Sequence, residues 1–332
     1  MSATGVWNPD LPKTPVVFLV FNRPDLTARV FETIRAARPD RLLIVADGPR
    51  PNRPSDGALC TETRRIVSSV DWPCDVRTNF AQSNMGCRDR VASGIDWAFG
   101  LVEEAIILED DCLPEMSFFR FCQELLDKYR DEPSVMHVSG ANLHDDALPA
   151  EHDYYFSRHA HIWGRATWRR AWRHYDPRMS SWGLFNGIDH FFNEPLHLGF
   201  RRHFRSRFDL TYAGRIDTWD YQWTIACWSN RALAITPSSN MVSNIGFDRR
   251  ATHTRGHSNL AAMPVYSCRF PLCHPAVLAR SREADNILES HHFHDTWWDR
   301  LRSLIDLSQH LSVQLVRGRR SLSRRVPRRL VR

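Results

Sequence analysis

The chain has 332 residues, of which 42% are hydrophobic and 25% are charged, a composition that excludes a largely disordered protein. Its longest apolar runs, such as 16–21, are far shorter than the roughly 20 residues that a membrane-spanning helix needs, and its first residues lack the pattern of a signal peptide. Eight cysteines without a C-x-x-C pair favour buried thiols in a reducing compartment over a disulfide or zinc framework. We therefore expect a cytoplasmic protein.

The net charge of +6 is unevenly distributed. Residues 317–332 contain eight arginines and no acidic residue, so the rest of the chain carries −2. A body without a basic surface argues against nucleic-acid binding. Residues 297–315 place apolar side chains at helical spacing before the arginines, which indicates an amphipathic helix and a polybasic arm over 296–332. Such an arm would attract an anionic membrane surface, on the inner face of the membrane; the alternative is a solvated end.

In the first half, apolar runs of strand length alternate with segments of helical periodicity. A run that is apolar on both faces, such as 16–21, is typical of a central strand in a parallel sheet. The predicted order is strand 16–21, a helix ending at Pro39, strand 42–46, helix 61–70, strand 75–80, helix 88–101 and strand 105–108. This alternation predicts an α/β fold with one doubly wound, mostly parallel sheet, whose ligands lie beyond the carboxyl ends of the strands.

From Ser134 onward the pattern changes. A strand over 135–139 precedes loops rich in tryptophan, histidine and arginine, and then a helix over 218–230 and a strand over 233–237. We therefore divide a domain over 14–295 into two halves, 14–133 and 134–295, of which the second is expected to shape the substrate site.

Three carboxylates, Glu109, Asp110 and Asp111, follow the buried run 105–108. They repel one another unless a cation or hydrogen-bond donors compensate. Mg²⁺ and Mn²⁺ prefer oxygen ligands, and Mg²⁺ sites commonly combine one or two carboxylates with substrate phosphates. The cluster is therefore suited to a metal that bridges a diphosphate, and the alternative is an exposed acidic turn.

Several short motifs together resemble a bacterial glycosyltransferase of the nucleotide-diphospho-sugar transferase (GT-A) superfamily. They are FNRP at 21–24, DG at 47–48, N-x-G at 84–86 and ILEDDCLP at 107–114. The order of these motifs is similar to that of family 2-like enzymes, and more distantly to that of the N-acetylglucosaminyltransferase that begins complex N-glycans. The resemblance covers about residues 14–260, and each motif is weak alone.

The resemblance implies a GT-A fold over 14–295. Its nucleotide-binding half, 14–133, would hold a nucleotide-diphosphate sugar as donor, and its acceptor-shaping half is 134–295. By position it implies nucleotide contacts from Phe21, Asn22 and Arg23, and hydrogen bonds from base or ribose to Asp47. The remaining implied contacts are Asn84 and Gly86 beside the ribose and diphosphate, Glu109 and Asp110 within the Asp-x-Asp equivalent, and Asp111 as the ligand of Mn²⁺ or Mg²⁺. The family has Asp where this chain has Glu109, which leaves open whether Glu109 contacts ribose or a metal-bound water.

Transfer with inversion needs a carboxylate that accepts the proton of the acceptor hydroxyl. The stretch WDYQW at 219–223 resembles the Trp-Asp-x-x-Trp stretch that carries this base in the distant relative, which makes Asp220 the candidate. Its flanking tryptophans could raise its pKa and stack on sugar faces. The alternative is a helix-capping carboxylate between two core tryptophans, and Asp217 is the competing base.

Two further segments resemble parts of the donor cleft. The segment 161–168 contains Trp163 and Arg165, which the resemblance places beside the donor sugar. The segment 244–253 lies where related enzymes close a loop over the diphosphate, so that His253 becomes a candidate metal ligand. A solvated basic loop is the alternative for this second segment.

The sequence therefore predicts a metal-dependent glycosyltransferase that moves a sugar from a nucleotide-diphosphate donor to a glycan or lipid-linked acceptor in cell-envelope polysaccharide synthesis. A sugar nucleotidyltransferase is one alternative, although FNRPDLT lacks the glycine-rich phosphate loop expected there. A non-catalytic glycan-binding protein at the membrane surface is another.

Overall fold

The first half forms four parallel strands flanked by three helices, as the alternating sequence predicts. The computed structural model describes residues 13–144, 151–184, 187–247 and 259–293. Adjacent strands in the order β3-β2-β1-β4 are all parallel. The elements are β1 (Val16–Val20), α1 (Pro24–Ala37), β2 (Arg41–Ala46), α2 (Ser55–Val67), β3 (Asp75–Phe80), α3 (Cys87–Leu101) and β4 (Glu104–Glu109).

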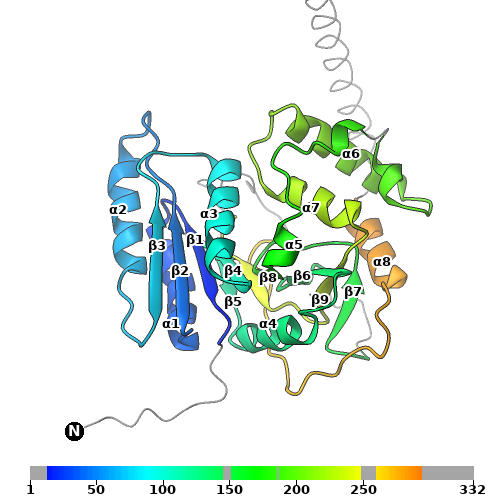
Figure 1. The fold of residues 1–332 in the computed structure, drawn as a ribbon, viewed down its shortest axis with the longest axis horizontal. Coiled ribbons are helices and arrows are strands. Elements are labelled where there is room, and N and C mark those ends of the chain that lie inside the picture. Colours follow the sequence, from blue (N-terminus) through cyan, green and yellow to red (C-terminus); the bar gives the residue numbers. More distant parts are fainter. Residues whose placement is uncertain (1–12, 145–150, 185–186, 248–258, 294–332) are drawn as a thin grey trace, which may run out of the picture.

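The second half extends the same sheet with strands of mixed direction, giving the eight-stranded order β3-β2-β1-β4-β8-β6-β9-β7 (Figure 1). The pair β6 and β9 is parallel, while β4 with β8, β8 with β6, and β9 with β7 are antiparallel. Its strands are β6 (Val135–Ser139), β7 (Tyr154–Ser157), β8 (Arg165–Trp168) and β9 (Leu233–Pro237). A separate two-stranded sheet pairs β5 (Cys112–Pro114) with β10 (Val242–Asn244).

Helices of the second half cover the extended sheet. They are α4 (Ser117–Lys128), α5 (Arg169–Trp172), α6 (Leu198–Tyr212), α7 (Asp220–Ser229) and α8 (Arg282–His292), with short 3-10 turns at η1 (Trp182–Leu184) and η2 (Ile188–Phe191).

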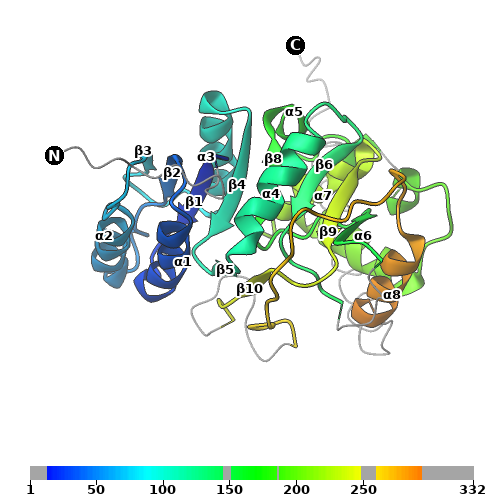
Figure 2. The same cartoon turned by 90° about the horizontal axis from the view of Figure 1, so that it is seen from below.

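Successive side chains of each strand point to opposite faces of the sheet, which explains why helices cover both faces. In β1, Val16 and Phe18 pack into one hydrophobic cluster with α1 and α4, whereas Val17 and Leu19 pack into a second cluster with α3 and α7. Because successive side chains of a strand point to opposite faces, a continuous apolar strand needs cover on both sides. Figure 2 shows α1 and α3 on opposite sides of β1. The predicted doubly wound α/β sheet is confirmed.

Most predicted boundaries lie within two residues of the observed ones, and the largest difference is at α2, in the first half. The helix predicted over 61–70 is α2, which runs over Ser55–Val67, and the helix predicted over 218–230 begins at Asp220. The sequence analysis did not foresee α4, α6 or α8, because their apolar side chains are interrupted by arginine, histidine and acidic residues.

All eight cysteines are free thiols, and four of them are buried, namely Cys60, Cys112, Cys122 and Cys227. Among the residues that the structure describes, no helix is both long and apolar enough to span a bilayer. The predicted amphipathic helix and the arginine arm of 296–332 lie outside the described residues, so they stay predictions.

Candidate active site

The acidic and polar motifs of the first half meet at one edge of the sheet. Since β1 to β4 are parallel, the residues that follow them lie along the same edge. Arg23 comes after β1, Asp47 after β2, and Glu109 is the last residue of β4, directly before Asp110 and Asp111. We call this the carboxyl edge.

Arg23 compensates the charge of two of the three clustered acids. Its guanidinium donates to Asp110 and, over 2.9 Å from Nη2 to Oδ2, to Asp111. Burial alone would lower the pKa of Arg23, but the two carboxylates outweigh burial and raise it. For the carboxylate of Asp110 burial has the opposite effect and raises the pKa, although the charge of Arg23 lowers it. The alternative of an exposed acidic turn is therefore wrong for Asp110, of which 3% is exposed.

Glu109 faces a second arginine, which comes from the other half of the chain. Arg165 opens β8 and is 1% exposed, and its Nη1 lies 3.6 Å from Oε1 of Glu109. The Glu109 side chain keeps 28% exposure, yet protein atoms surround it on most sides. Burial raises its pKa to about 7, with Arg165 lowering it and Asp111 raising it further.

Arg165 has a hydrogen-bonding group without a protein partner. Its guanidinium stacks 3.9 Å from the ring centroid of Trp219, and Nη1 donates to the carbonyl of Ile162 over 3.2 Å. Its Nη2 is buried and has no hydrogen-bond partner in the described structure. A buried donor of this kind is costly unless something else satisfies it. A ligand at the carboxyl edge could do so if the atoms that now cover Nη2 move aside, because this nitrogen has almost no accessible surface.

Asp47 anchors the loop after β3. Its Oδ1 accepts from the backbone amides of Gly48, over 2.7 Å, and Met85, over 3.0 Å, while Oδ2 accepts from Nδ2 of Asn84 over 2.8 Å. Burial raises the pKa of Asp47, and the amide of Met85 is the largest opposing influence. Asp47 and Asn84 therefore form one unit, in which Asp47 orients Asn84.

Phe21 and Asn22 lie beside a residue that the sequence analysis missed. Asn22 donates from Nδ2 to Asp56 of α2 over 2.9 Å, and Arg50 donates to the same carboxylate over 2.6 Å. Arg50 also lies 5.2 Å from the ring centroid of Phe21. Asp56 thus fixes both residues of the loop after β1, and its place two residues after Pro54, in the first turn of a helix, gave no sign of this role.

Gly86 and Asp217 join the two halves at the start of α3. Gly86 has a φ of 83°, and a Cβ there would lie 2.7 Å from Oδ2 of Asp217, so both conformation and space favour glycine. The Asp217 carboxylate accepts from the backbone amides of Cys87, over 3.0 Å, and Arg88, over 3.1 Å. Asp217, the competing candidate for the base, therefore caps α3.

Asp220 reaches the same region from α7. Its Oδ1 accepts from the amide of Tyr221 over 2.9 Å and from the hydroxyl of Thr218. Burial lowers the pKa of Arg165 to about 10, and the negative charges of Glu109 and Asp220 act in the opposite direction by raising it. Arg165 therefore links the acid at the end of β4 to the acid at the start of α7.

The tryptophans beside Asp220 belong to the core. Trp219 is 2% exposed and Trp223 is 1% exposed. Trp223 donates from Nε1 to Nδ1 of His137 over 3.1 Å and packs 5.2 Å from Trp172 between ring centroids. The prediction that these rings could stack on sugar faces is wrong, because neither ring has a free face.

The chain passes Asp111 again after β10. The amide of Ile245 donates to the carbonyl of Asp111 over 2.9 Å, and a Cβ on Gly246 would lie 2.2 Å from Oδ2 of Asp111. Phe247 then packs edge to face on Trp163, 5.6 Å between centroids. The predicted ligand His253 lies outside the described residues.

Two further arginines, which the sequence analysis did not single out, brace the strand ends. Arg64 of α2 donates to the carbonyls of Asp47, over 3.0 Å, and Ala81, over 2.6 Å. Arg90 of α3 donates to Oδ1 of Asn79 over 3.1 Å. They fix the carboxyl ends of β2 and β3 from opposite faces of the sheet.

The acids of the carboxyl edge offer oxygen donors of the kind that Mg²⁺ and Mn²⁺ prefer. Within the described ranges no three His, Cys, Asp or Glu side chains are grouped so as to hold a metal ion. A divalent ion here would therefore depend on Asp111, with Asp110 nearby, and on ligands from the substrate. The donor chemistry fits such an ion.

No protein-family model matches the sequence, and no curated protein matches it either. Among solved structures, part of the fold is similar to a mannosyltransferase from Pyrobaculum calidifontis in complex with GDP-Man and Mn²⁺, at 15% identity over 49% of this chain and 46% of that one, with a TM-score of 0.35. It is also similar to a UDP-glucose pyrophosphorylase complexed with UDP-glucose, at 13% identity over 48% of this chain and 79% of that one, with a TM-score of 0.28. A third similar structure, 4-diphosphocytidyl-2C-methyl-D-erythritol synthase from Anaerococcus prevotii, has 9% identity over 53% of this chain and 80% of that one, with a TM-score of 0.28. The match spans less than half the length of the mannosyltransferase.

Proposed function

We propose that the protein is a glycosyltransferase that moves a sugar from a nucleotide-diphosphate donor to a glycan or lipid-linked acceptor. The observation that carries this proposal is the arrangement at the carboxyl edge: Arg165, with a buried and unpartnered Nη2, faces Glu109 beside the acids that follow β4. A diphosphate oxygen would satisfy that donor, and the neighbouring acids would need a cation to accept the same diphosphate.

The donor nucleotide occupies the loops after β1, β2 and β3 in this proposal. Phe21 and Asn22, held by Asp56 and Arg50, line the base and ribose. Asp47 and Asn84 offer hydrogen-bonding groups to the ribose, while Arg23 is in place to donate to the diphosphate once a cation takes its position on Asp111.

Asp111 would hold Mn²⁺ or Mg²⁺, with His253 proposed as a further ligand because the chain passes beside Asp111 at Gly246. When bound, such an ion offsets the charge of a departing diphosphate. Arg23 and Arg165 contribute fixed positive charge to the same leaving group, so the protein stabilises the charge that develops as the glycosidic bond breaks.

Asp220 is the proposed base. Both hydrogen bonds that its side chain accepts in the described structure reach Oδ1, so Oδ2 is available to an acceptor hydroxyl. The hydroxyl oxygen forms the new bond to the anomeric carbon, the bond from that carbon to the phosphate oxygen breaks, and the proton passes to Asp220. Attack opposite to the leaving group inverts the anomeric configuration.

A product assay tests the proposal. The protein is incubated with a panel of nucleotide sugars, Mn²⁺ and candidate acceptors, and we expect release of nucleoside diphosphate. The alternative, a sugar nucleotidyltransferase, would instead form nucleoside triphosphate and sugar phosphate when pyrophosphate is added, and this result would refute glycosyl transfer.

The variant Asp220→Asn separates the base from the donor site. We expect turnover to fall about 100- to 10,000-fold, the usual contribution of general base catalysis, with unchanged donor affinity by calorimetry. Full turnover in this variant would remove Asp220 from the mechanism. Asp209→Asn, a matched change in α6, whose carboxylate accepts from Trp182, should leave turnover unchanged.

A further inference from the structure

A cavity lies at the edge of the sheet opposite to the carboxyl edge. Leu233, at the start of β9, pairs with Val135 at the start of β6, and Arg158 directly follows β7, which runs antiparallel to β9. The carboxyl end of β6, by contrast, pairs with Arg165 at the carboxyl edge. The cavity has a volume of about 220 Å³ and opens between the segment after η2, the start of β9 and the segment before α8.

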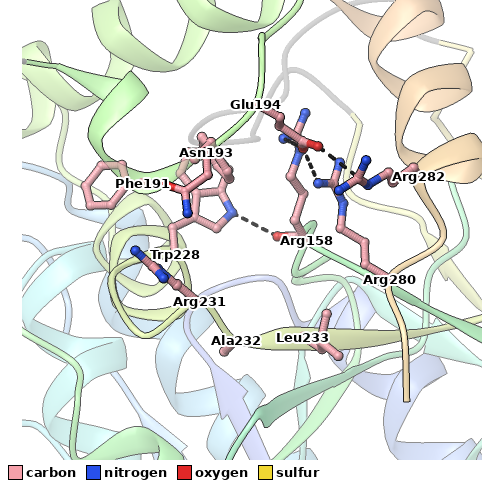
Figure 3. A pocket seen from close by; sticks show the side chains of 11 residues that line it. Arg158, Phe191, Asn193, Glu194, Trp228, Arg231, Ala232, Leu233, Arg280 and Arg282 are labelled. Atoms are coloured by element: carbon pink, nitrogen blue, oxygen red, sulfur yellow. Dashed lines mark hydrogen bonds and ion pairs between the residues drawn. The ribbon is translucent and has the colours of Figure 1, made fainter. Parts of the chain in front are cut away.

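Arginines dominate the lining of this cavity. Four arginines and a single carboxylate, Glu194, contribute to its walls, and the arginines are Arg158, Arg231, Arg280 and Arg282. Figure 3 shows the side chains of three of them converging on Glu194, with Trp228, Phe191 and Arg231 at the other end. The carboxylate of Glu194 thus pairs with three guanidinium groups.

The ion pairs behind the walls do not balance this charge. Arg158 donates to Glu194 over 3.0 Å and, from Nε, to Glu289 over 2.8 Å. Arg280 donates to Glu194 and to Asp285, and Arg282 lies 3.6 Å from Glu194. Three carboxylates therefore face four arginines, because Arg231 has no ion pair in the described part of the chain.

The surplus charge cannot be removed by deprotonation, because arginine stays charged in proteins. Arg158 is only 5% exposed and already meets Glu194 and Glu289. The charge without an ion pair in the described structure is that of Arg231, which is exposed at the mouth of the cavity, as is Arg282. An anion that enters the cavity would neutralise the cluster and would share the donors that now meet on Glu194.

An apolar wall stands beside the arginines. Phe191 and Trp228 are 6% and 2% exposed, and both contribute to the lining. The guanidinium of Arg158 lies 4.6 Å from the ring centroid of Phe192. Trp228 also packs on Phe192, Phe200 and Phe204, so its ring offers no free face for stacking. The aromatic side chains give the cavity an apolar wall next to Arg231, and polar groups beside an apolar wall are the usual composition of small-molecule sites.

We propose that this cavity binds a small organic anion, in which a phosphate or carboxylate is attached to an apolar group. The acidic group lies against Arg231, at the end of the cavity that Trp228 and Phe191 line. The site is separate from the carboxyl edge and does not depend on the proposed glycosyl transfer.

Arg231 provides a test that does not damage the fold. It follows the end of α7 with a φ of 50°, and its amide donates to the carbonyl of Trp228 while that of Ala232 donates to Cys227. This is a helix end at which glycine is the least strained residue. Arg231→Gly should therefore leave the melting temperature unchanged or raise it while removing the cation.

Arg38 is the matched control. It also follows a helix, α1, with a φ of 49°, and it is exposed and outside the cavity lining. Arg38→Gly relieves the same backbone strain and removes the same charge without touching the cavity.

The experiment is a calorimetric titration of the full-length protein with phenyl phosphate and, separately, with benzoate. We expect at least one of the two to bind, and the tighter one identifies the acidic group. Arg231→Gly should weaken that binding by roughly tenfold, as expected for one charge-assisted hydrogen bond, while Arg38→Gly and Asp111→Asn leave it unchanged.

Three results would overturn the proposal. They are no binding of either probe to the unmodified protein, equal affinity in Arg231→Gly, and loss of binding in Asp111→Asn, which would place the anion at the carboxyl edge. Since Asp111→Asn alters only the carboxyl edge, failure of the proposed glycosyl transfer and failure of this cavity give different results.

Discussion

Arginines and carboxylates cluster at both edges of the sheet, but carboxylates outnumber arginines in one cluster and arginines outnumber carboxylates in the other. At the carboxyl edge, Glu109, Asp110 and Asp111 face two arginines, so acids are in excess. At the other edge, four arginines face three carboxylates. An excess of acid suits a cation with its anionic substrate, whereas an excess of arginine suits an anion alone. This difference is the reason why we propose different ligands for the two edges.

The two edges also differ in how completely their donors are satisfied. Arg158 and Arg280 each meet two carboxylates, whereas Arg165 has a buried Nη2 without a partner in the described structure. Structural ion pairs are normally complete, because an unpaired buried donor is costly. Arg35, Arg64 and Arg90 also have a buried Nε without a hydrogen-bond partner in the described structure, but Arg165 is the one of these four that faces Glu109, which is why we propose it as a ligand contact.

Among the changes that test this comparison of the two edges, the largest expected effect comes from Arg165→Lys, which keeps the charge but removes the planar group and its Nη2. We expect turnover of the donor to fall by about 10- to 100-fold, since one positioned donor to a developing charge commonly contributes on this scale or above. Steady-state kinetics with a fixed acceptor measures it.

Arg170→Lys is the control, because Arg170 also stacks on a tryptophan, Trp168, at 4.3 Å, but donates only to backbone carbonyls of the protein. It should change stability and not turnover. Equal turnover in Arg165→Lys and the unmodified protein would contradict the role assigned to Arg165.

A smaller effect concerns the pH dependence of stability. The pKa of Glu109 is raised from 4.5 to about 7, so between these values the folded protein holds a proton that the unfolded chain releases. The free energy of unfolding therefore falls as the pH rises through this window. In Glu109→Gln this fall should be absent, so the variant gains stability relative to the unmodified protein from pH 4.5 to 7. Urea unfolding at several pH values would show it, and parallel pH profiles would contradict the raised pKa.

The smallest effect should come from Asp217→Ala. Loss of the two hydrogen bonds at the start of α3 should lower the free energy of unfolding by about 1 kcal/mol, as for other helix caps. Donor turnover should change far less than in Asp220→Asn. Chemical denaturation and kinetics on the same samples distinguish a capping carboxylate from a base. If turnover falls more in Asp217→Ala than in Asp220→Asn, Asp217 is the base and Asp220 is not.

The parallel half of the fold follows from the sequence more directly than the antiparallel half. Continuous apolar runs such as 16–20 and 42–46 predict buried strands by themselves, and each is followed by its own polar residues, so the acids could be placed at one edge. The strand β8 carries RATW at 165–168 and lies between β4 and β6 although it comes later in the chain. No local pattern gives such a pairing, which depends on distant segments.

The candidate site shows the same contrast. Residues 109–111 could be identified because they stand at the end of the apolar run of β4 in the sequence itself. Asp47 could be identified because it directly follows β2. Asp56 could not be identified, because Asn22 is far from it in sequence and meets it only where the loop after β1 lies beside α2, and because its nearer partner, Arg50, precedes it in a segment without a periodic pattern. The tryptophans at 219 and 223 were assigned to sugar contacts because a sequence gives their apolar character but not their burial.

The central claim is that the acids after β4 hold a divalent ion together with a nucleotide diphosphate. Calorimetric binding of nucleoside diphosphates, with and without Mn²⁺, to the unmodified protein and to Asp111→Asn tests it most directly. We predict that Mn²⁺ strengthens binding at least tenfold in the unmodified protein, on the order of the energy of one charge-assisted contact, and has no effect in Asp111→Asn. Equal affinity with and without Mn²⁺ in the unmodified protein would contradict the account.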